Sequence, residues 1–333
     1  MILPPPKSNY AQNTTGKLSV DLDALLRNYR LAQELLPGKT VACVVKANAY
    51  GLGMDRIAPF LHAHGCKDFF VATIHEAIAL RSLLHDATIA VTHGFHTGFA
   101  DAYQAHQLIP CLITLAQVHA LIKVAPSLAC YVFFDTALNR LGLDRSDFDD
   151  FLRLRDHLNI RCIMSHLACA DNLKDSTNHQ QLQDFQEICS HFPSVPSSLG
   201  ASFALDLKPE FCSDMLRLGV GLYGARTNQI SFENVVTLSL PVLQIRTIAK
   251  NAGVGYGLTF RASRTTRIAT VAGGYGDGIH RLASNKLKGR LHGHIVQQVG
   301  TISMDSMGFD ITDTPDAACG DEITVLGQGI TLA

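Results

Sequence analysis

Lys46 is the residue of this sequence best placed to form a covalent bond with a carbonyl compound. It follows the apolar run at residues 41–45, which has the composition of a buried strand, and it opens the segment Lys46-Ala47-Asn48-Ala49-Tyr50-Gly51. Desolvation lowers the pKa of an ammonium group, and the resulting neutral amine can form a Schiff base. The same position also suits a surface lysine at a strand end, so spacing alone leaves both interpretations open.

Two further polar residues follow apolar runs in the same way. Asp135 comes after residues 129–134, and His166 comes after residues 161–165. Barrels carry their active-site groups at the carboxyl ends of the strands, because the strand fixes the backbone while the loop beyond it can vary. A histidine there can equally be a hydrogen-bonded core residue. Tyr256, which lies in a glycine-rich segment, would ordinarily be a turn or packing residue.

These strand ends belong to a stretch, from about residue 18 to 240, in which β-prone runs alternate with amphipathic segments. In the first unit Asp21 is a helix N-cap, apolar residues follow at helical spacing, and Pro37-Gly38 ends the helix. We expect eight strands, at residues 40–45, 69–73, 88–91, 110–114, 129–134, 161–165, 198–202 and 215–220. This number and span predict a (β/α)₈ barrel. A doubly wound sheet is the alternative, and the polar residues at the strand ends favour the barrel.

The character of the chain changes after about Pro241. Short β-rich segments, including residues 268–271, 294–299 and 322–326, are separated by Gly, Asn and Asp, without a long helical pattern. The expected organisation is a tail or strand at residues 1–16, a barrel at 17–240 and an all-β domain at 241–333.

Composition points to a small-molecule ligand. The 28 basic and 29 acidic residues among 333 nearly cancel, so no net field favours nucleic acid or an anionic membrane. The nine cysteines are scattered singly, without a C-x-x-C pair, which favours a reduced cytoplasm and gives no reason to expect a metal. No run has membrane-spanning length, and the first 17 residues lack the apolar core of a signal peptide.

Several segments, in the same order along the chain, resemble motifs of the alanine racemases. These are pyridoxal phosphate (PLP) enzymes with a (β/α)₈ barrel and a C-terminal β domain. The resemblance extends from about residue 18 to 327 and is carried by Val44-Val45-Lys46-Ala47-Asn48-Ala49-Tyr50-Gly51, Asn139-Arg140-Leu141-Gly142, Ser165-His166, Arg217-Leu218-Gly219-Val220-Gly221-Leu222-Tyr223-Gly224, Val254-Gly255-Tyr256-Gly257, Gly274-Tyr275-Gly276-Asp277-Gly278, Met304-Asp305 and Gly320-Asp321-Glu322.

The resemblance implies a two-base racemisation of L- and D-alanine. Lys46 would carry PLP and act as one base, and Tyr256 would act as the other base on the opposite face of a planar carbanion. Arg217 would contact the pyridine nitrogen, and His166 would lie between Arg217 and Tyr256. An always-charged donor at that nitrogen makes PLP a weaker electron sink, which suits racemisation and argues against a decarboxylase on a similar scaffold.

The remaining implied roles concern binding and assembly. Cofactor-binding residues besides Lys46, His166 and Arg217 are expected to be Tyr50, Ser202, Gly219, Val220 and Tyr223. Substrate would be contacted by Arg140, Met304, Asp305 and Tyr275. The family forms a homodimer in which Tyr256 and Met304 of one subunit complete the site of the other, and its product D-alanine supplies peptidoglycan synthesis in the cytoplasm.

The sequence departs from the family pattern at four places. Phe133 stands where the family often has a lysine, Ala137 where glycine is usual, and Ala201 where asparagine precedes the serine. The chain ends at Ala333, before the family's C-terminal helix and a tyrosine that contacts the phosphate, as a truncated β domain would. We therefore expect Arg140 to be held differently and PLP to be retained more weakly. Two alternatives stay open: a PLP racemase of broader specificity, and a PLP-binding paralogue with little turnover.

Overall fold

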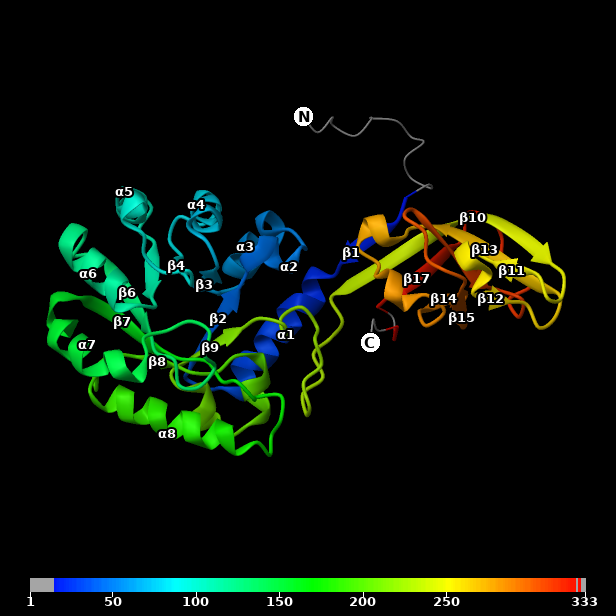
Figure 1. Ribbon diagram of the computed structural model, residues 1–333. Helices are drawn as coiled ribbons and strands as arrows, with labels where there is room; N and C mark the ends of the chain where they lie inside the picture. The colour runs from blue at the N-terminus through cyan, green and yellow to red at the C-terminus, as the bar shows by residue number, and fades with distance from the viewer. Residues whose placement is uncertain (1–14, 328, 331–333) are drawn as a thin grey trace. The chain divides into compact units, whose positions relative to one another are not determined.

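The structure, a computed structural model, describes residues 15–327, 329 and 330, and most of the expected N-terminal segment 1–16 lies outside these residues (Figure 1). The chain divides into two compact units. One is Leu22–Glu233, and the other combines the chain up to Asp21 with the chain from Asn234 onwards.

Leu22–Glu233 contains an eight-stranded parallel sheet in the order β8-β7-β6-β5-β4-β3-β2-β9. A parallel bridge between Ala201 and Arg217 joins the β8 side to β9 and closes the sheet into a barrel. All eight predicted strands and the barrel are thereby confirmed. The strands are β2 (Thr40–Val44), β3 (Asp68–Val71), β4 (Thr88–Val91), β5 (Ile109–Leu112), β6 (Ala129–Phe133), β7 (Asn159–Met164), β8 (Ser197–Ser198) and β9 (Met215–Leu218).

Helices connect these strands and lie outside them in Figure 1. The first, α1, begins directly after Asp21 as predicted, and its apolar face, including Leu25 and Tyr29, is buried. Threonine side chains cap α4 and α6. The helices are α1 (Leu22–Leu35), α3 (Met54–Ala63), α4 (Ile74–Leu83), α5 (Ala100–Ala105), α6 (Leu115–Val124), α7 (Phe148–Leu154) and α8 (Ser176–Ser190), with the short segment α2 (Lys46–Tyr50) and the 3₁₀ turns η2 (Thr97–Phe99), η3 (Arg145–Asp147), η4 (Arg155–His157), η5 (Ser202–Asp206) and η6 (Pro209–Cys212).

The interior of the barrel is filled by side chains from alternate positions of its strands. One buried cluster comprises Ala42, Phe70, Ala90, Cys111, Tyr131, Cys162, Met164 and Met215. All nine cysteines are free thiols, and Cys319 is the exposed one. A filled interior leaves room for a ligand only at an end of the barrel.

The second unit is an antiparallel sheet in the order β1-β10-β13-β16-β15-β14-β17, with β10 also pairing with β17. Its strands are β1 (Lys17–Val20), β10 (Val236–Ile248), β13 (Thr266–Ala272), β14 (Lys288–Leu291), β15 (His294–Val299), β16 (Ser306–Asp310) and β17 (Glu322–Leu326), beside the hairpin β11 (Gly253–Val254) and β12 (Phe260–Arg261) and the turns η7 (Tyr256–Leu258), η8 (Tyr275–Asp277) and η9 (Arg281–Ala283). Buried apolar residues such as Val271 and Phe309 form its core.

The division between the units differs from the expected boundaries at 16/17 and 240/241. The long strand β10 begins at Val236 and pairs with β1 as well as with β13 and β17. Residues 17–21 and 234–240 therefore fold with the β domain. Pro241 suggests a break in the sequence but lies within β10, opposite Glu322. No helix in the described part of the chain is long and apolar enough to cross a membrane.

Candidate active site

A cavity of about 400 Å³ opens at the carboxyl ends of the barrel strands. Apolar side chains from the strand ends, such as Val44 and Met164, form part of its wall. Eight residues that the sequence analysis singled out line this one cavity: Lys46, Tyr50, Arg140, His166, Ser202, Arg217, Gly219 and Val220.

Lys46 opens a turn with unusual backbone geometry. The φ angles of the next four residues, Ala47 to Tyr50, are 52°, 55°, 53° and 57°, so the segment is a left-handed turn without glycine. Each such residue costs about 1–2 kcal/mol relative to right-handed backbone. Hydrogen bonds from the Ala49 N–H to the Val45 carbonyl (2.8 Å) and from the Gly51 N–H to the Ala47 carbonyl (2.8 Å) close the turn.

The amine of Lys46 stands in an electropositive environment. Desolvation lowers its pKa, the positive charges of Arg140 and Arg217 lower it further, and the carboxylate of Glu76 opposes the change. A larger fraction of the amine is therefore neutral than in an ordinary lysine, as bond formation with a carbonyl requires.

Arg217 is buried at the end of β9 and held by its two terminal nitrogens. Nη1 donates to the carbonyl and hydroxyl of Ser198, and Nη2 donates to the carbonyls of Ser165 and Leu199 and to Nδ1 of His166 (3.0 Å). No hydrogen bond among the described residues uses its Nε–H. Desolvation lowers the pKa of Arg217 to about 10, so the guanidinium stays charged at neutral pH.

His166 is neutral because of its burial and of this neighbour. Desolvation, followed by the charges of Arg217, Arg140 and Lys46, lowers the pKa of His166 to about 3. Since an arginine can only donate, Nδ1 of His166 accepts, and the single ring proton lies on Nε2.

Ser202 and Gly219 form a second polar corner of the cavity. The hydroxyl of Ser202 accepts hydrogen bonds from the N–H groups of Gly219 (3.1 Å) and Gly221 (3.0 Å). A Cβ on Gly219 would lie 2.7 Å from the hydroxyl of Tyr50, so the glycine leaves room for this hydroxyl at the corner. The N–H of Val220 donates no hydrogen bond to any of the described residues. Backbone N–H groups and hydroxyls gathered in this way suit a phosphate.

Tyr223 does not line the cavity. Its hydroxyl donates to the Val44 carbonyl (2.9 Å), and its ring packs against that of Tyr50 at a centroid distance of 4.6 Å. The structure therefore gives Tyr223 a supporting position behind Tyr50.

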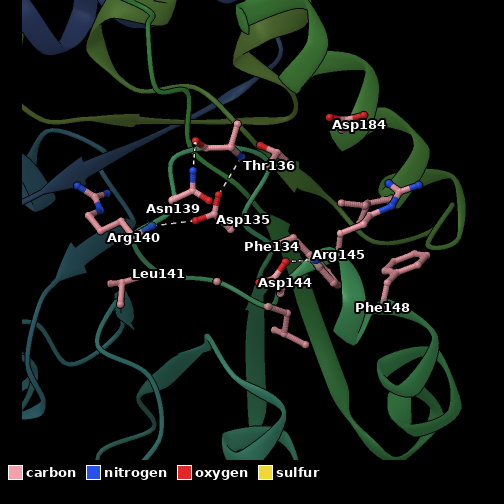
Figure 2. A pocket seen from close by; sticks show the side chains of 14 residues that line it. Phe134, Asp135, Thr136, Asn139, Arg140, Leu141, Asp144, Arg145, Phe148 and Asp184 are labelled. Atoms are coloured by element: carbon pink, nitrogen blue, oxygen red, sulfur yellow. Dashed lines mark hydrogen bonds between the residues drawn. The ribbon is translucent and has the colours of Figure 1, made fainter.

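Arg140 lies on a loop that is organised by Asp135. The carboxylate of Asp135 accepts the N–H groups of Ala137 (2.8 Å) and Arg140 (2.9 Å), and Figure 2 shows the Arg140 side chain pointing away from Arg145 on the other side of the loop. Burial acts to raise the pKa of Asp135, but the surrounding N–H groups lower it overall. The guanidinium of Arg140 has no hydrogen-bond partner or ion pair among the described residues, and the uncharged side chain of Phe133 lines the same cavity.

The remaining predicted site residues, Tyr256, Tyr275, Met304 and Asp305, all lie in the β domain. The N–H of Tyr275 donates to the Ser303 carbonyl (3.0 Å), and the hydroxyl of Thr301 donates to the Tyr256 carbonyl (2.8 Å). The backbone of Asp305, next to Met304, accepts the N–H of Gly273 (2.8 Å). The side chains of Tyr256, Tyr275 and Met304 are all exposed.

Comparison with protein families and curated proteins gives a consistent result. Residues 20–227 match the description "Alanine racemase, N-terminal domain", and residues 235–333 match "Alanine racemase, C-terminal domain". The chain belongs to the alanine racemase family. The alanine racemase of Acidiphilium cryptum is 40% identical over 324 residues, covering 94% of this chain and 90% of that protein. The catabolic alanine racemase of Rhizobium johnstonii is 38% identical, covering 97% and 89%.

Solved structures of the racemase family share the fold. The alanine racemase from Bartonella henselae with covalently bound pyridoxal phosphate superimposes with a TM-score of 0.89 at 32% identity, covering 94% of this chain and 91% of that chain. The biosynthetic alanine racemase from Pseudomonas aeruginosa gives 0.88 at 30% identity, covering 96% and 92%.

Two polar side chains that support residues of this site were not predicted from the sequence. Glu76, the third residue of α4, accepts the Ala47 N–H, and its T-x-x-E capping pattern with Thr73 was the available signal. Gln181 on α8 is fully buried and donates both to the Thr136 hydroxyl (3.0 Å) and to the His166 carbonyl (3.0 Å). No local pattern marks Gln181, because its partners lie on other elements.

Proposed function

We propose that this chain is a PLP-dependent alanine racemase that interconverts L- and D-alanine. Family membership supports the activity. The observation that carries the assignment of residues is one cavity that holds Lys46, the Arg217–His166 pair and the Ser202–Gly219 corner.

The cavity suits the cofactor in charge and in donors. Three cations, Lys46, Arg140 and Arg217, face it, and no carboxylate of the described residues lines it. Lys46 would bind the carbonyl carbon of PLP, while Ser202 and the backbone N–H groups of Gly219 and Val220 would hold its phosphate. The hydroxyl of Tyr50 would add a donor there. The Nε–H of Arg217 would meet the ring nitrogen.

Two bases complete the mechanism. PLP, when bound, draws electrons from the Cα of the amino acid and makes its proton acidic. The amine of Lys46 removes the Cα proton of D-alanine, and the phenol of Tyr256 removes that of L-alanine. In each direction the other group returns a proton to the opposite face of Cα. His166, neutral and ordered by Arg217, would polarise Tyr256.

A homodimer with shared sites is the assembly that we propose. Tyr256, Tyr275, Met304 and Asp305 would face the barrel cavity of a second subunit, where Arg140 and Met304 bind the substrate carboxylate. The exposure of the Tyr256 and Met304 side chains supports this arrangement. The product would supply D-alanine for peptidoglycan synthesis in the cytoplasm.

A PLP-binding protein with little turnover is the second candidate. The guanidinium of Arg140 has no hydrogen bond or ion pair among the described residues. The neighbouring Phe133 side chain in the cavity wall is uncharged and cannot form an ion pair with it. A site with a loosely held carboxylate-binding group would bind cofactor but turn over slowly.

Chiral analysis decides between these functions. The purified chain is incubated with PLP and either L-alanine or L-serine, beside Lys46→Ala and the exposed control Lys123→Ala. Racemisation of L-alanine by the wild type and by Lys123→Ala, with neither racemisation nor a borohydride-sensitive visible absorption band in Lys46→Ala, is expected. Comparable racemisation of L-serine would indicate broader specificity. An absorption band without racemisation would leave the second candidate standing.

A further inference from the structure

Glu76 makes more hydrogen bonds than its place in the fold requires. It is the third residue of α4, where a capping-box carboxylate accepts the N–H of the N-cap residue. Its Oε2 does so with Thr73 (3.1 Å) and also accepts the Ala72 N–H (2.9 Å). Its Oε1 reaches another segment and accepts the N–H of Ala47 (2.6 Å). One carboxylate thus joins the end of β2 to the start of α4.

Ala47 is the first residue of the left-handed turn behind Lys46. Four consecutive residues with positive φ are each strained, and their strain adds up, so the turn persists only if its ends are fixed. The side-chain oxygen of Asn48 accepts the Met54 N–H (2.8 Å) and ties the turn to α3. Glu76 ties its beginning. Loss of the Glu76 contact would free the backbone that carries both Lys46 and Tyr50.

Helix capping alone does not explain a glutamate at position 76. The equivalent third residue of α6 is Gln117, whose N–H is capped by the Thr114 hydroxyl (3.2 Å) and whose Oε1 accepts the Ile113 N–H (3.1 Å). A neutral amide with one acceptor oxygen is therefore sufficient at this position beside a threonine N-cap in this barrel. Glu76 differs from Gln117 in two respects: it has a second acceptor oxygen, which accepts the Ala47 N–H, and it carries a negative charge.

The charge of Glu76 matters because the groups that face Lys46 are otherwise positive or neutral. Arg140 and Arg217 are cationic, His166 is neutral, and the hydroxyl of Tyr50 and the ring of His93 share the cavity. Glu76 is the carboxylate that raises the pKa of Lys46 against the two arginines and desolvation.

We propose that Glu76 is a positioning residue of this site: its carboxylate spans the ends of β2 and α4 and fixes the left-handed turn that presents Lys46 and Tyr50. This inference rests on the proposed function for its catalytic consequence but not for its structural one. Glu76 is not among the residues that line the cavity, and its carboxylate acts through the backbone of Ala47 and through its charge.

The test compares Glu76→Gln with Gln117→Ala. Glu76→Gln keeps one acceptor for the α4 cap but cannot serve Ala47 as well and has no charge. Gln117→Ala removes the corresponding side-chain hydrogen bond at the start of α6, to the Ile113 N–H, and reports the cost of losing that contact alone. The first readout is the pH dependence of reductive methylation of Lys46 in the cofactor-free full chain, followed by mass spectrometry of the peptide that contains Lys46.

For Glu76→Gln, the midpoint of that methylation profile should fall by about one pH unit, because a nearby negative charge is removed. In the loaded enzyme, kcat for alanine should fall at least about tenfold with KM within about twofold, because the amine and not the substrate site is displaced. Gln117→Ala should leave both the midpoint and kcat near the wild-type values.

An unchanged midpoint and unchanged kcat in folded Glu76→Gln would overturn the proposal, as would equal losses in Gln117→Ala. If Glu76→Gln does not fold, Glu76→Asp replaces it. The shorter carboxylate of that variant keeps the charge but lacks one methylene and cannot reach both segments. The midpoint should then stay while kcat falls, and wild-type kcat would overturn the positioning role. A shifted midpoint in a chain that racemises nothing would retain the positioning role and refute the proposed function.

Discussion

The barrel and the β domain present their candidate residues in opposite ways. In the barrel, Arg217 and Ser202 are 6% and 1% exposed, and the side chain of each takes part in at least two hydrogen bonds within the barrel. In the β domain, the side chains of Tyr256 and Met304 are 71% and 61% exposed and stand on turns held by backbone contacts. Preorganised, buried donors suit a permanently bound cofactor. Exposed side chains on hydrogen-bonded turns suit a surface that completes a site elsewhere.

Tyr256→Phe tests the assigned role of the β domain and has the largest expected effect. Removal of the phenol should slow proton removal from L-alanine by about 10²–10⁴-fold, the usual contribution of a general base, with much less effect on D-alanine. Deuterium incorporation from D₂O into each enantiomer measures the two rates separately. The visible absorption band should persist, because the barrel alone would hold the cofactor. Wild-type exchange of both enantiomers would exclude Tyr256 as a base.

A mixture of two inactive variants tests whether the two halves come from different subunits. In a mixed dimer of Lys46→Ala and Tyr256→Phe, one shared site collects both changes and the other collects none. Random exchange makes half of the dimers mixed, so about a quarter of all sites should regain activity. Mass spectrometry of intact dimers verifies the exchange. Exchanged dimers without recovered activity would place both residues in a site formed by one chain.

The buried Arg217–His166 pair of the barrel predicts an effect of pH on stability. Unfolded His166 takes up a proton below about pH 6.5, whereas the folded side chain, with its pKa lowered to about 3, does not. The unfolded chain therefore binds more protons between these values, and the free energy of unfolding falls as the pH falls. This one group contributes up to about 1.4 kcal/mol per pH unit in that window.

Urea unfolding between about pH 4 and 6 checks this effect, because the window lies between the folded and unfolded pKa values of His166. His166→Gln should reduce the slope of unfolding free energy against pH, while His119→Gln, which replaces an exposed histidine of α6, should keep the wild-type slope. Identical slopes in all three proteins would show that His166 takes up its proton over the same pH range in the folded and in the unfolded chain.

The positions of the barrel residues could largely be predicted from the sequence, because local patterns mark the ends of the strands. Buried apolar runs indicate where Lys46 and His166 lie on the barrel rim. The strand expected at 198–202 shortens to Ser197–Ser198, since the chain turns into η5 at Ser202. Glu76 and Gln181 were missed because their partners lie 29 and 45 residues away, at Ala47 and Thr136. Long-range hydrogen bonds leave no periodic signal.

A substitution at Ala137 has the smallest predicted effect, and it tests whether the backbone of the loop that carries Arg140 is strained. Its φ of 138° lies in a region that glycine adopts freely and alanine does not. Ala137→Gly should relieve this strain and raise the free energy of unfolding by about 1 kcal/mol, since the relief exceeds the added entropy of glycine in the unfolded chain. In Ala79→Gly, an exposed position inside α4, the same substitution should instead lower it by about 0.5–1 kcal/mol. Urea unfolding of both variants measures the two signs. If Ala137→Gly is destabilised as much as Ala79→Gly, the Asp135 hydrogen bonds already hold the loop without strain at this position.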